Sequence, residues 1–297
     1  MQGDTVTGSA FSAAASRGRL LLDGAMATYV HAMRGESGGV GACDGLSLSD
    51  PALVRRVHED YLAAGADIVR TNSFRAAARD HADDASQLCA AAARLARDAA
   101  DAWTRRTPER ARLVAGALGP ADERGPHERV RAAYRAPLRA LLDGGVDLVL
   151  LETCCHPAQA SAALAAVADA TADAGRDVPV ILSMALGAGG RLAVSGASID
   201  DLLAAIDPAA VAALGVNCGA GPEGLHGALA ALGRHTALVT CHPSAGLPGA
   251  DGRHPVAPGD FARQVSSYVA AGLAHVVGGC CGTTPAHVAA LAHAGPQ

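Results

Sequence analysis

Residues 141–152, LLDGGVDLVLLE, are the stretch from which the fold of this 297-residue chain can be predicted. Apolar residues at helical spacing lead into Gly144-Gly145, where glycine suits a left-handed helix cap, and a short apolar run then ends at Glu152. Two further stretches have the same pattern: YLAAGADIVRTN (61–72) and YVAAGLAHVVGG (268–279). The chain therefore repeats a unit in which a helix, a glycine and a strand follow one another.

Eight short apolar runs are expected to be strands, and segments with helical spacing separate them. They are residues 19–23, 66–71, 112–117, 147–152, 178–184, 210–217, 236–241 and 273–279. Runs that are apolar throughout are typical of a parallel sheet covered by helices. Eight such units in somewhat more than the ~250 residues typical of the fold predict a single (β/α)8 TIM barrel over residues 18–297. An open doubly wound sheet is the alternative, and residues 1–17, rich in Ser, Ala and Gly, are expected to be a mobile tail.

Composition and charge exclude several classes of function. The formal net charge is −5, and all 24 basic residues are scattered arginines, which argues against a nucleic-acid partner. The absence of lysine excludes Schiff-base chemistry and the covalent anchoring of pyridoxal phosphate, because both need an ε-amine. No apolar stretch approaches the ~18 uncharged residues of a membrane span, and the N-terminus lacks the features of a secretory signal. We therefore expect a cytoplasmic enzyme with no membrane partner, whose eight cysteines are reduced.

Polar residues, thiols and one glycine stand where the predicted strands end, and the active site of a TIM barrel lies at that face. These residues are Asp23, Thr71, Asn72, Gly119, Glu152, Ser183, Asn217, Cys218, His242, Cys280 and Cys281. Three thiols, those of Cys218, Cys280 and Cys281, fall at the ends of the sixth and eighth strands. Three thiolates on one zinc leave a fourth position open, as in catalytic zinc sites, and an exogenous thiol could occupy it. Zinc would hold that thiol as the thiolate, the nucleophile needed to take an alkyl group from sulfur, nitrogen or cobalt.

The chain resembles the homocysteine S-methyltransferase family over roughly residues 20–295. LLDGAMAT (21–28), GADIVRTNSF (65–74), GALGP (116–120), DLVLLET (147–153), GVNCG (215–219) and VGGCCGTTP (277–285) match the family's blocks in order. The resemblance implies that Cys218, Cys280 and Cys281 bind Zn²⁺. It also implies that Asp23 and Glu152 hold the ammonium group of the substrate, with backbone amides near Gly24 and Ala25 taking part. Asn72, Ser183, Asn217 and His242 are further candidates at the mouth of the barrel.

The function expected from the resemblance is zinc-dependent transfer of a methyl group to the thiol of L-homocysteine, which gives L-methionine. Candidate methyl donors are S-methylmethionine, S-adenosylmethionine, a betaine, or methylcobalamin carried by another protein. Ala27, Ala121 and Ser244 depart from the usual family blocks; these changes spare the cysteines and leave the donor open.

Four alternatives stay open at this point. The chain could be a homocysteine- and zinc-binding module that needs a separate corrinoid protein, or its acceptor could be another small thiol or a selenol. GGCCGTTP could instead cradle a phosphate with backbone amides. Cys154, Cys155 and His156 could form a second metal or redox group, although burial under the next helix is the simpler interpretation. Cys241 also lies near the mouth and has no assigned role.

Overall fold

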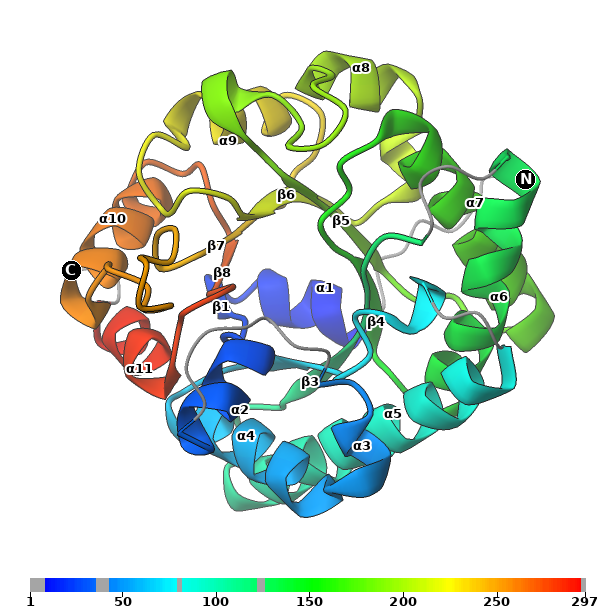
Figure 1. The fold of residues 1–297 in the computed structure, drawn as a ribbon, viewed down its shortest axis with the longest axis horizontal. Coiled ribbons are helices and arrows are strands. Elements are labelled where there is room, and N and C mark those ends of the chain that lie inside the picture. The colour runs from blue at the N-terminus through cyan, green and yellow to red at the C-terminus, as the bar shows by residue number, and fades with distance from the viewer. Residues whose placement is uncertain (1–8, 36–42, 79–81, 122–125, 295–297) are drawn as a thin grey trace.

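The computed structural model describes residues 9–35, 43–78, 82–121 and 126–294, and its centre is one sheet of eight parallel strands (Figure 1). The strands are β1 (Leu20–Leu21), β2 (Ile68–Arg70), β3 (Leu113–Leu118), β4 (Leu148–Leu151), β5 (Val180–Ala185), β6 (Ala213–Cys218), β7 (Val239–Pro243) and β8 (Val276–Val277). Their order is β1-β8-β7-β6-β5-β4-β3-β2. A parallel bridge between Leu22 and Ile68 joins the two ends of this order. The predicted (β/α)8 barrel is confirmed, and the open doubly wound sheet is excluded.

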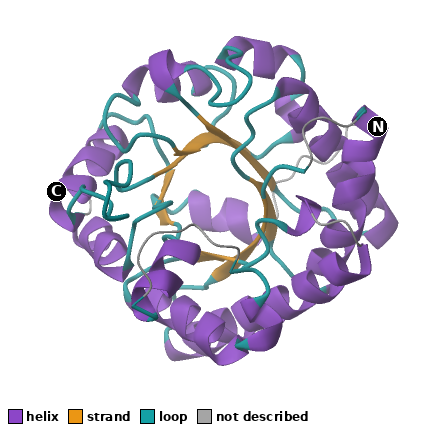
Figure 2. Cartoon of the chain, viewed as in Figure 1, coloured by secondary structure: helices purple, strands orange, loops and turns teal. Residues whose placement is uncertain are grey.

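Helices surround the sheet, as Figure 2 shows. Those that follow a strand and return to the next are α4 (Pro51–Ala63), α5 (Ala82–Arg106), α6 (His127–Asp143), α7 (Pro157–Ala174), α8 (Ile199–Ala204), α9 (His226–Leu232) and α10 (Pro258–Ala270). Helix α11 (Pro285–His293) follows β8, the last strand. Two shorter helices, α2 (Ala27–Met33) and α3 (Leu46–Ser49), lie in the connection between β1 and α4. Among the described residues, no helix is long and apolar enough to cross a membrane.

The glycine of each repeated unit has the backbone conformation that the sequence predicts. Gly65, Gly145 and Gly272 have φ angles of +105°, +79° and +68°, a region that side chains with a Cβ rarely adopt. Each glycine ends a helix and redirects the chain into the following strand. Eight predicted strands therefore lie where they were expected, although most are shorter than the apolar runs that revealed them.

Side chains alternate between the inside and the outside of the barrel. In β4, Leu148 and Leu150 belong to the interior cluster, whereas Val149 and Leu151 belong to the cluster beneath the helices. The interior cluster also contains Ile68, Ile181 and Ala213 from other strands. Because successive strand residues face opposite sides, the inward residues of neighbouring strands form layers.

The N-terminal end of the barrel is closed by α1 (Ala10–Ala15), which Figure 1 shows across the centre of the ring. The Phe11 side chain is fully buried and belongs to the same interior cluster as Leu20 and Leu22. Ser9 caps the helix by accepting a hydrogen bond from the Ser12 amide. Residues 10–15 of the expected tail thus pack against the barrel, and residues 1–8 lie outside the described residues.

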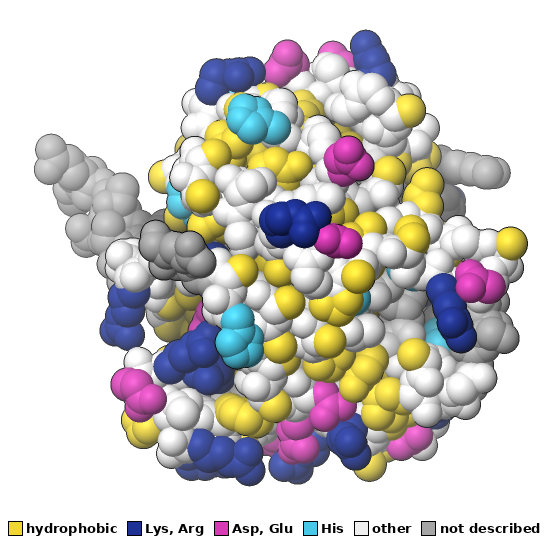
Figure 3. All heavy atoms as spheres, turned by 90° about the vertical axis from the view of Figure 1, so that its left-hand side faces the viewer, with side chains coloured by type: hydrophobic (Ala, Val, Ile, Leu, Met, Phe, Trp, Pro, Cys, Tyr) yellow, Lys and Arg dark blue, Asp and Glu magenta, His cyan; other side chains and the backbone are white. Residues whose placement is uncertain are grey.

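The surface drawn in Figure 3 carries arginine, acidic and histidine side chains dispersed among neutral and apolar ones. Several arginines form ion pairs along a helix, such as Arg55 with Glu59 and Arg139 with Asp143. Such exposed pairs contribute little stability. The arginines on this face are not gathered into the basic stripe that nucleic-acid binding would require.

Gly215 generates a prediction about barrel stability. A Cβ added there would lie 2.5 Å from the Thr240 carbonyl oxygen and would overlap the Thr240 hydroxyl. We expect Gly215→Ala to lower the free energy of unfolding by about 1–3 kcal/mol, the usual cost of overpacking, as measured by urea denaturation. Gly227→Ala is the matched control, because a Cβ at Gly227 in α9 meets nothing within 4 Å. Equal stability of the two variants would contradict this account of β6–β7 packing.

Candidate active site

A layer of inward-facing polar side chains lies above the apolar interior, at the C-terminal ends of the strands. Arg70 lies two residues after Ile68, Glu152 two after Leu150, and Ser183 two after Ile181, so each continues the inward-facing row of its strand. Asn217 and His242 end the corresponding rows of β6 and β7, in register with each other. All five side chains are buried. The apolar barrel therefore ends in a polar floor beneath the mouth.

Cys218 leaves this alternation because its backbone has the left-handed conformation, with φ of +58°. Among the described residues other than glycine, only Thr153 shares a positive φ. Such conformations cost free energy and often occur at functional sites. The turn brings the Cys218 Sγ to 3.6 Å from the Cys281 Sγ. Cys280 approaches from β8, where its amide donates to the Pro243 carbonyl oxygen.

The three thiols are arranged as a metal site would require. The sulfur atoms of Cys218, Cys280 and Cys281 lie within 4.8 Å of one another, and no other such group of metal-ligating side chains occurs among the described residues. Hydrogen bonding with Cys280 and Cys281 lowers the pKa of Cys218 well below its ordinary value. Hydrogen bonding with Cys218 and Cys281, together with burial, raises the pKa of Cys280. Three thiols that compete for protons in this way fit a divalent cation, which would stabilise all three as thiolates.

Arg70 joins the two carboxylates that were predicted to bind substrate. Its Nε donates to Asp23 Oδ1 at 2.7 Å, and its Nη1 donates to Glu152 Oε2 at 3.1 Å. Burial acts against the charged guanidinium, but Asp23 and Glu152 outweigh it and raise the pKa of Arg70. Burial also raises the pKa of each carboxyl group, and Arg70 acts in the opposite direction. With both carboxylates ionised, the three side chains carry one net negative charge.

One cavity of about 530 Å³ brings these groups together. Its lining includes Asp23, Gly24, Ala25, Arg70, Glu152, Cys218, Cys280 and Cys281, with apolar walls from Met26, Phe74, Pro120 and Val194. The predicted metal ligands and the predicted substrate-binding residues therefore face one space.

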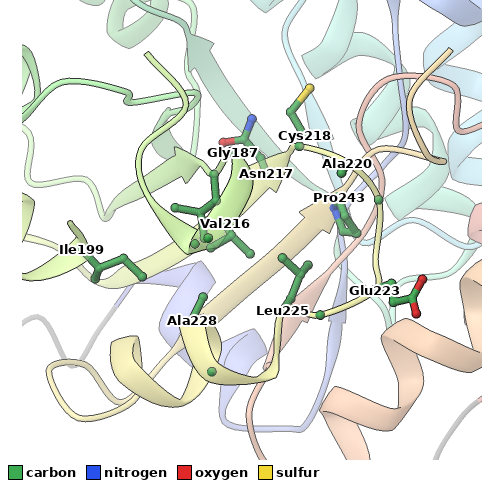
Figure 4. A pocket seen from close by; sticks show the side chains of 17 residues that line it. Gly187, Ile199, Val216, Asn217, Cys218, Ala220, Glu223, Leu225, Ala228 and Pro243 are labelled. Atoms are coloured by element: carbon green, nitrogen blue, oxygen red, sulfur yellow. The ribbon is translucent and has the colours of Figure 1, made fainter. Parts of the chain in front are cut away.

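A second cavity, of about 570 Å³, lies between the segments after β5 and β6 and helix α9 (Figure 4). In this view the Cys218 sulfur points away from the Leu225 and Ala228 side chains. Cys218 also borders this cavity, but Cys280, Cys281 and the acidic pair do not. The first cavity is therefore the one in which thiol chemistry can occur.

The other candidates at the mouth have definite partners. Asn72 Nδ2 donates to the Cys43 carbonyl oxygen and the Ser47 hydroxyl, so Asn72 fixes α3 and the residue Cys43 that precedes it. Ser183 donates to Asn217 Oδ1, which also accepts from the Thr153 amide. These amide and hydroxyl groups hold the strand ends in place, although Asn72 also lines the cavity.

His242 and the backbone near Gly24 complete the surroundings. His242 Nε2 lies 3.8 Å from Glu152 Oε2, and neither ring nitrogen has a hydrogen-bond partner among the described residues. Burial and Arg70 keep the pKa of His242 far below its ordinary value, so the ring is neutral. The Ala25 amide donates to Thr283 Oγ1 at 3.1 Å. Of the two predicted backbone donors, that of Ala25 is therefore already engaged.

Two contributors were absent from the prediction. Arg70 could have been found, because a charged residue interrupts the apolar run of GADIVRTN where the strand ends. Tyr61 donates from its hydroxyl to the Ala25 carbonyl oxygen at 2.7 Å and so fixes the β1 loop. Nothing in the sequence marks Tyr61 for this, because it lies on the buried face of α4 like any core residue.

The remaining cysteines near the mouth are packed. Cys154, Cys155 and Cys241 are buried, and among the described residues none of them belongs to a group of three potential metal ligands. Burial raises the pKa of Cys241 to about 12, which makes it a poor nucleophile. The packing interpretation is therefore the one that the structure supports for Cys154 and for Cys155, although Cys155 also lines the first cavity, whereas His156 is half-buried.

The comparisons with known proteins agree with this geometry. Residues 20–295 match the family model described as homocysteine S-methyltransferase. The chain is 35% identical to the methionine synthase of Mycobacterium leprae over 84% of its length and 34% identical to that of Mycobacterium tuberculosis over 92%. It spans only 22% and 24% of these relatives.

Solved structures of similar length also match. The homocysteine methyltransferase MmuM from Escherichia coli, in its apo form, has a TM-score of 0.73 and 32% identity, over 93% of this chain and 96% of that chain. Its metallated form has a TM-score of 0.74 and 31% identity, over 92% and 95% of the respective chains. With the family model covering nearly the whole barrel, this chain belongs to the homocysteine S-methyltransferase family.

Proposed function

We propose that this protein transfers a methyl group to the thiol of L-homocysteine, giving L-methionine. The observation that carries the proposal is the convergence of three thiols and an acidic pair on one cavity. An amino-acid thiol has one group for each part of this site: a sulfur for the cysteine cluster and an ammonium for the carboxylates. The acidic pair and Arg70 together have one net negative charge, which matches a single ammonium group.

Zinc is the metal that we propose for the cysteine cluster, with Cys218, Cys280 and Cys281 as its ligands. Thiolate ligands favour zinc among the common divalent ions, and three of them leave a position for the acceptor. When bound, zinc would lower the pKa of the acceptor thiol, so that the nucleophilic thiolate is available near neutral pH. The cytoplasm is the expected compartment, because reducing conditions would keep the cysteines able to bind metal.

The residues of the cavity would orient the acceptor for reaction. Glu152 and Asp23, joined by Arg70, provide the negative charge for the ammonium group. We expect the Gly24 amide to face the acceptor carboxylate, because the Ala25 amide already donates to Thr283. Met26, Phe74 and Val194 would provide apolar walls beside the donor methyl while the acceptor thiolate attacks it in line. The new sulfur–methyl bond forms as the bond between the methyl group and its donor atom breaks, and the demethylated donor leaves with that electron pair.

The methyl donor divides the proposal into two forms. The stand-alone form uses S-methylmethionine, S-adenosylmethionine or a betaine, and the match to nearly the full length of MmuM supports it. The second form is a module that receives the methyl group from methylcobalamin on a separate corrinoid protein. Its support is that the chain matches only about a quarter of the methionine synthases.

The metal ligands yield the first prediction of this section. We expect Cys218→Ala and Cys281→Ala each to lose stoichiometric zinc and to lower methyl transfer by more than about 100-fold, since even outer-shell partners of a metal contribute 10–100-fold. Metal analysis and a methionine-formation assay would measure this. Cys89→Ala is the matched control, because Cys89 is a buried cysteine of α5 outside the cluster. Full zinc content and activity in both cluster variants would contradict the assignment.

A donor experiment separates the two forms of the proposal. Zinc-loaded protein is incubated with L-homocysteine and each small-molecule donor, then with free methylcobalamin, and methionine is quantified. We expect turnover with at least one small-molecule donor if the protein acts alone. Turnover with methylcobalamin only would identify the corrinoid-dependent form. No methionine from any donor, with zinc and homocysteine both bound, would contradict the stand-alone function.

A further inference from the structure

Arg70 has more roles in the cavity than charge neutralisation alone requires. Besides its ion pairs with Asp23 and Glu152, its Nη2 donates to the carbonyl oxygens of Gly24 at 2.6 Å and Gly279 at 2.7 Å. One buried guanidinium thus contacts the ends of β1, β4 and β8 from its position on β2. Planar, delocalised arginine suits such a multidentate site, whereas lysine has only one point of charge.

The two carboxylates use their oxygen atoms differently. Asp23 accepts from Arg70 at both oxygens: Oδ1 from Nε at 2.7 Å and Oδ2 from the backbone amide at 2.9 Å. Glu152 accepts from Arg70 at Oε2 alone, and its Oε1 accepts no hydrogen bond from any other described residue. Both side chains are almost completely buried, with exposures of 3% for Asp23 and 7% for Glu152.

We propose that Arg70 is a positioning residue for the ammonium group of the acceptor. Asp23 fixes the Arg70 guanidinium, and Arg70 in turn holds Oε2 of Glu152, so that Oε1 of Glu152 faces the amine. This inference rests on the proposed function. It divides the roles of two carboxylates that the family resemblance treats alike. Glu152 contacts the substrate, and Asp23 acts through Arg70. Arg70 thereby sets how strongly the site prefers an amino-acid thiol over a thiol without the amine.

Because Arg70 also contacts Gly24 and Gly279, an Arg70 variant would have two looser loops. A lower free energy of unfolding in that variant would therefore not test the positioning role. A preference between two ligands is a better measure. L-homocysteine and 4-mercaptobutanoate share the thiol and the carboxylate and differ only in the amine. The ratio of their dissociation constants reports the ammonium interaction. Loosening of the loops at Gly24 and Gly279 would weaken the binding of both ligands and leave this ratio unchanged.

The experiment measures both dissociation constants by calorimetry on zinc-loaded wild type, Arg70→Met, Glu152→Gln and the double variant, with zinc content determined for each. A hydrogen bond to a charged group is worth about tenfold to a hundredfold in affinity. We expect Glu152→Gln to reduce the preference for homocysteine by that factor and Arg70→Met to reduce it at least about tenfold. The double variant should resemble Glu152→Gln within about twofold, because both changes remove one interaction.

Two results would overturn the inference. One is Arg70→Met weakening both ligands equally, with the preference intact, and the other is additive loss in the double variant. If Arg70→Met does not fold, Arg70→Lys takes its place: a reduced preference supports the inference and a wild-type preference refutes it. Arg97→Met is the control, since Arg97 pairs with Asp147 away from the cavity and should affect unfolding only. A wild type that does not prefer homocysteine would instead contradict the proposed acceptor.

Discussion

Eight parallel strands that close into a barrel must all end on the same face, and this constraint places every polar group of the candidate site. The alternation of side chains then fixes which residues face inward. Leu148 and Leu150 fill the interior, so Glu152 must continue the row at the mouth. Arg70 and Ser183 follow from Ile68 and Ile181 by the same two-residue step. The chemistry of the mouth is therefore a consequence of the register of the apolar core beneath it.

The buried charges depend on one another in a way that no single strand reveals. An isolated carboxylate or guanidinium inside the barrel would cost several kcal/mol, and pairing makes it tolerable. Arg70 provides the pairing by reaching across from β2 to β1 and β4. The cysteine cluster presents the complementary problem, because three thiolates repel one another until a cation is bound. A net charge of −1 on one side and a candidate metal site on the other suit a ligand with an ammonium group and a sulfur.

Most of the fold was predictable because it depends on local patterns. Glycine caps followed by apolar runs located three strands, and similar apolar runs located the other five; the glycines at 65, 145 and 272 have the expected positive φ. The cysteine cluster was predictable for a related reason: strand ends share one face, so thiols ending two strands can converge. The seating of α1 was not predictable, because a Ser- and Ala-rich segment with a single phenylalanine carries little periodic signal. Phe11 packs into the apolar interior of the barrel, which forms only when the strands come together.

The arrangement of the site was predictable only in part, because it depends on register between distant segments. Asp23 and Glu152 could be placed at the mouth, but the arginine between them lies 47 residues from one and 82 from the other. The left-handed backbone of Cys218 was equally hidden, since a side chain with a Cβ gives no sign of that conformation. The central claim concerns the sulfur ligands, and X-ray absorption at the metal edge tests it most directly. The account predicts one zinc with three sulfur ligands that become four when L-homocysteine is added. Correctly folded protein that takes up no zinc, or zinc whose sulfur count stays the same with homocysteine bound, would contradict it.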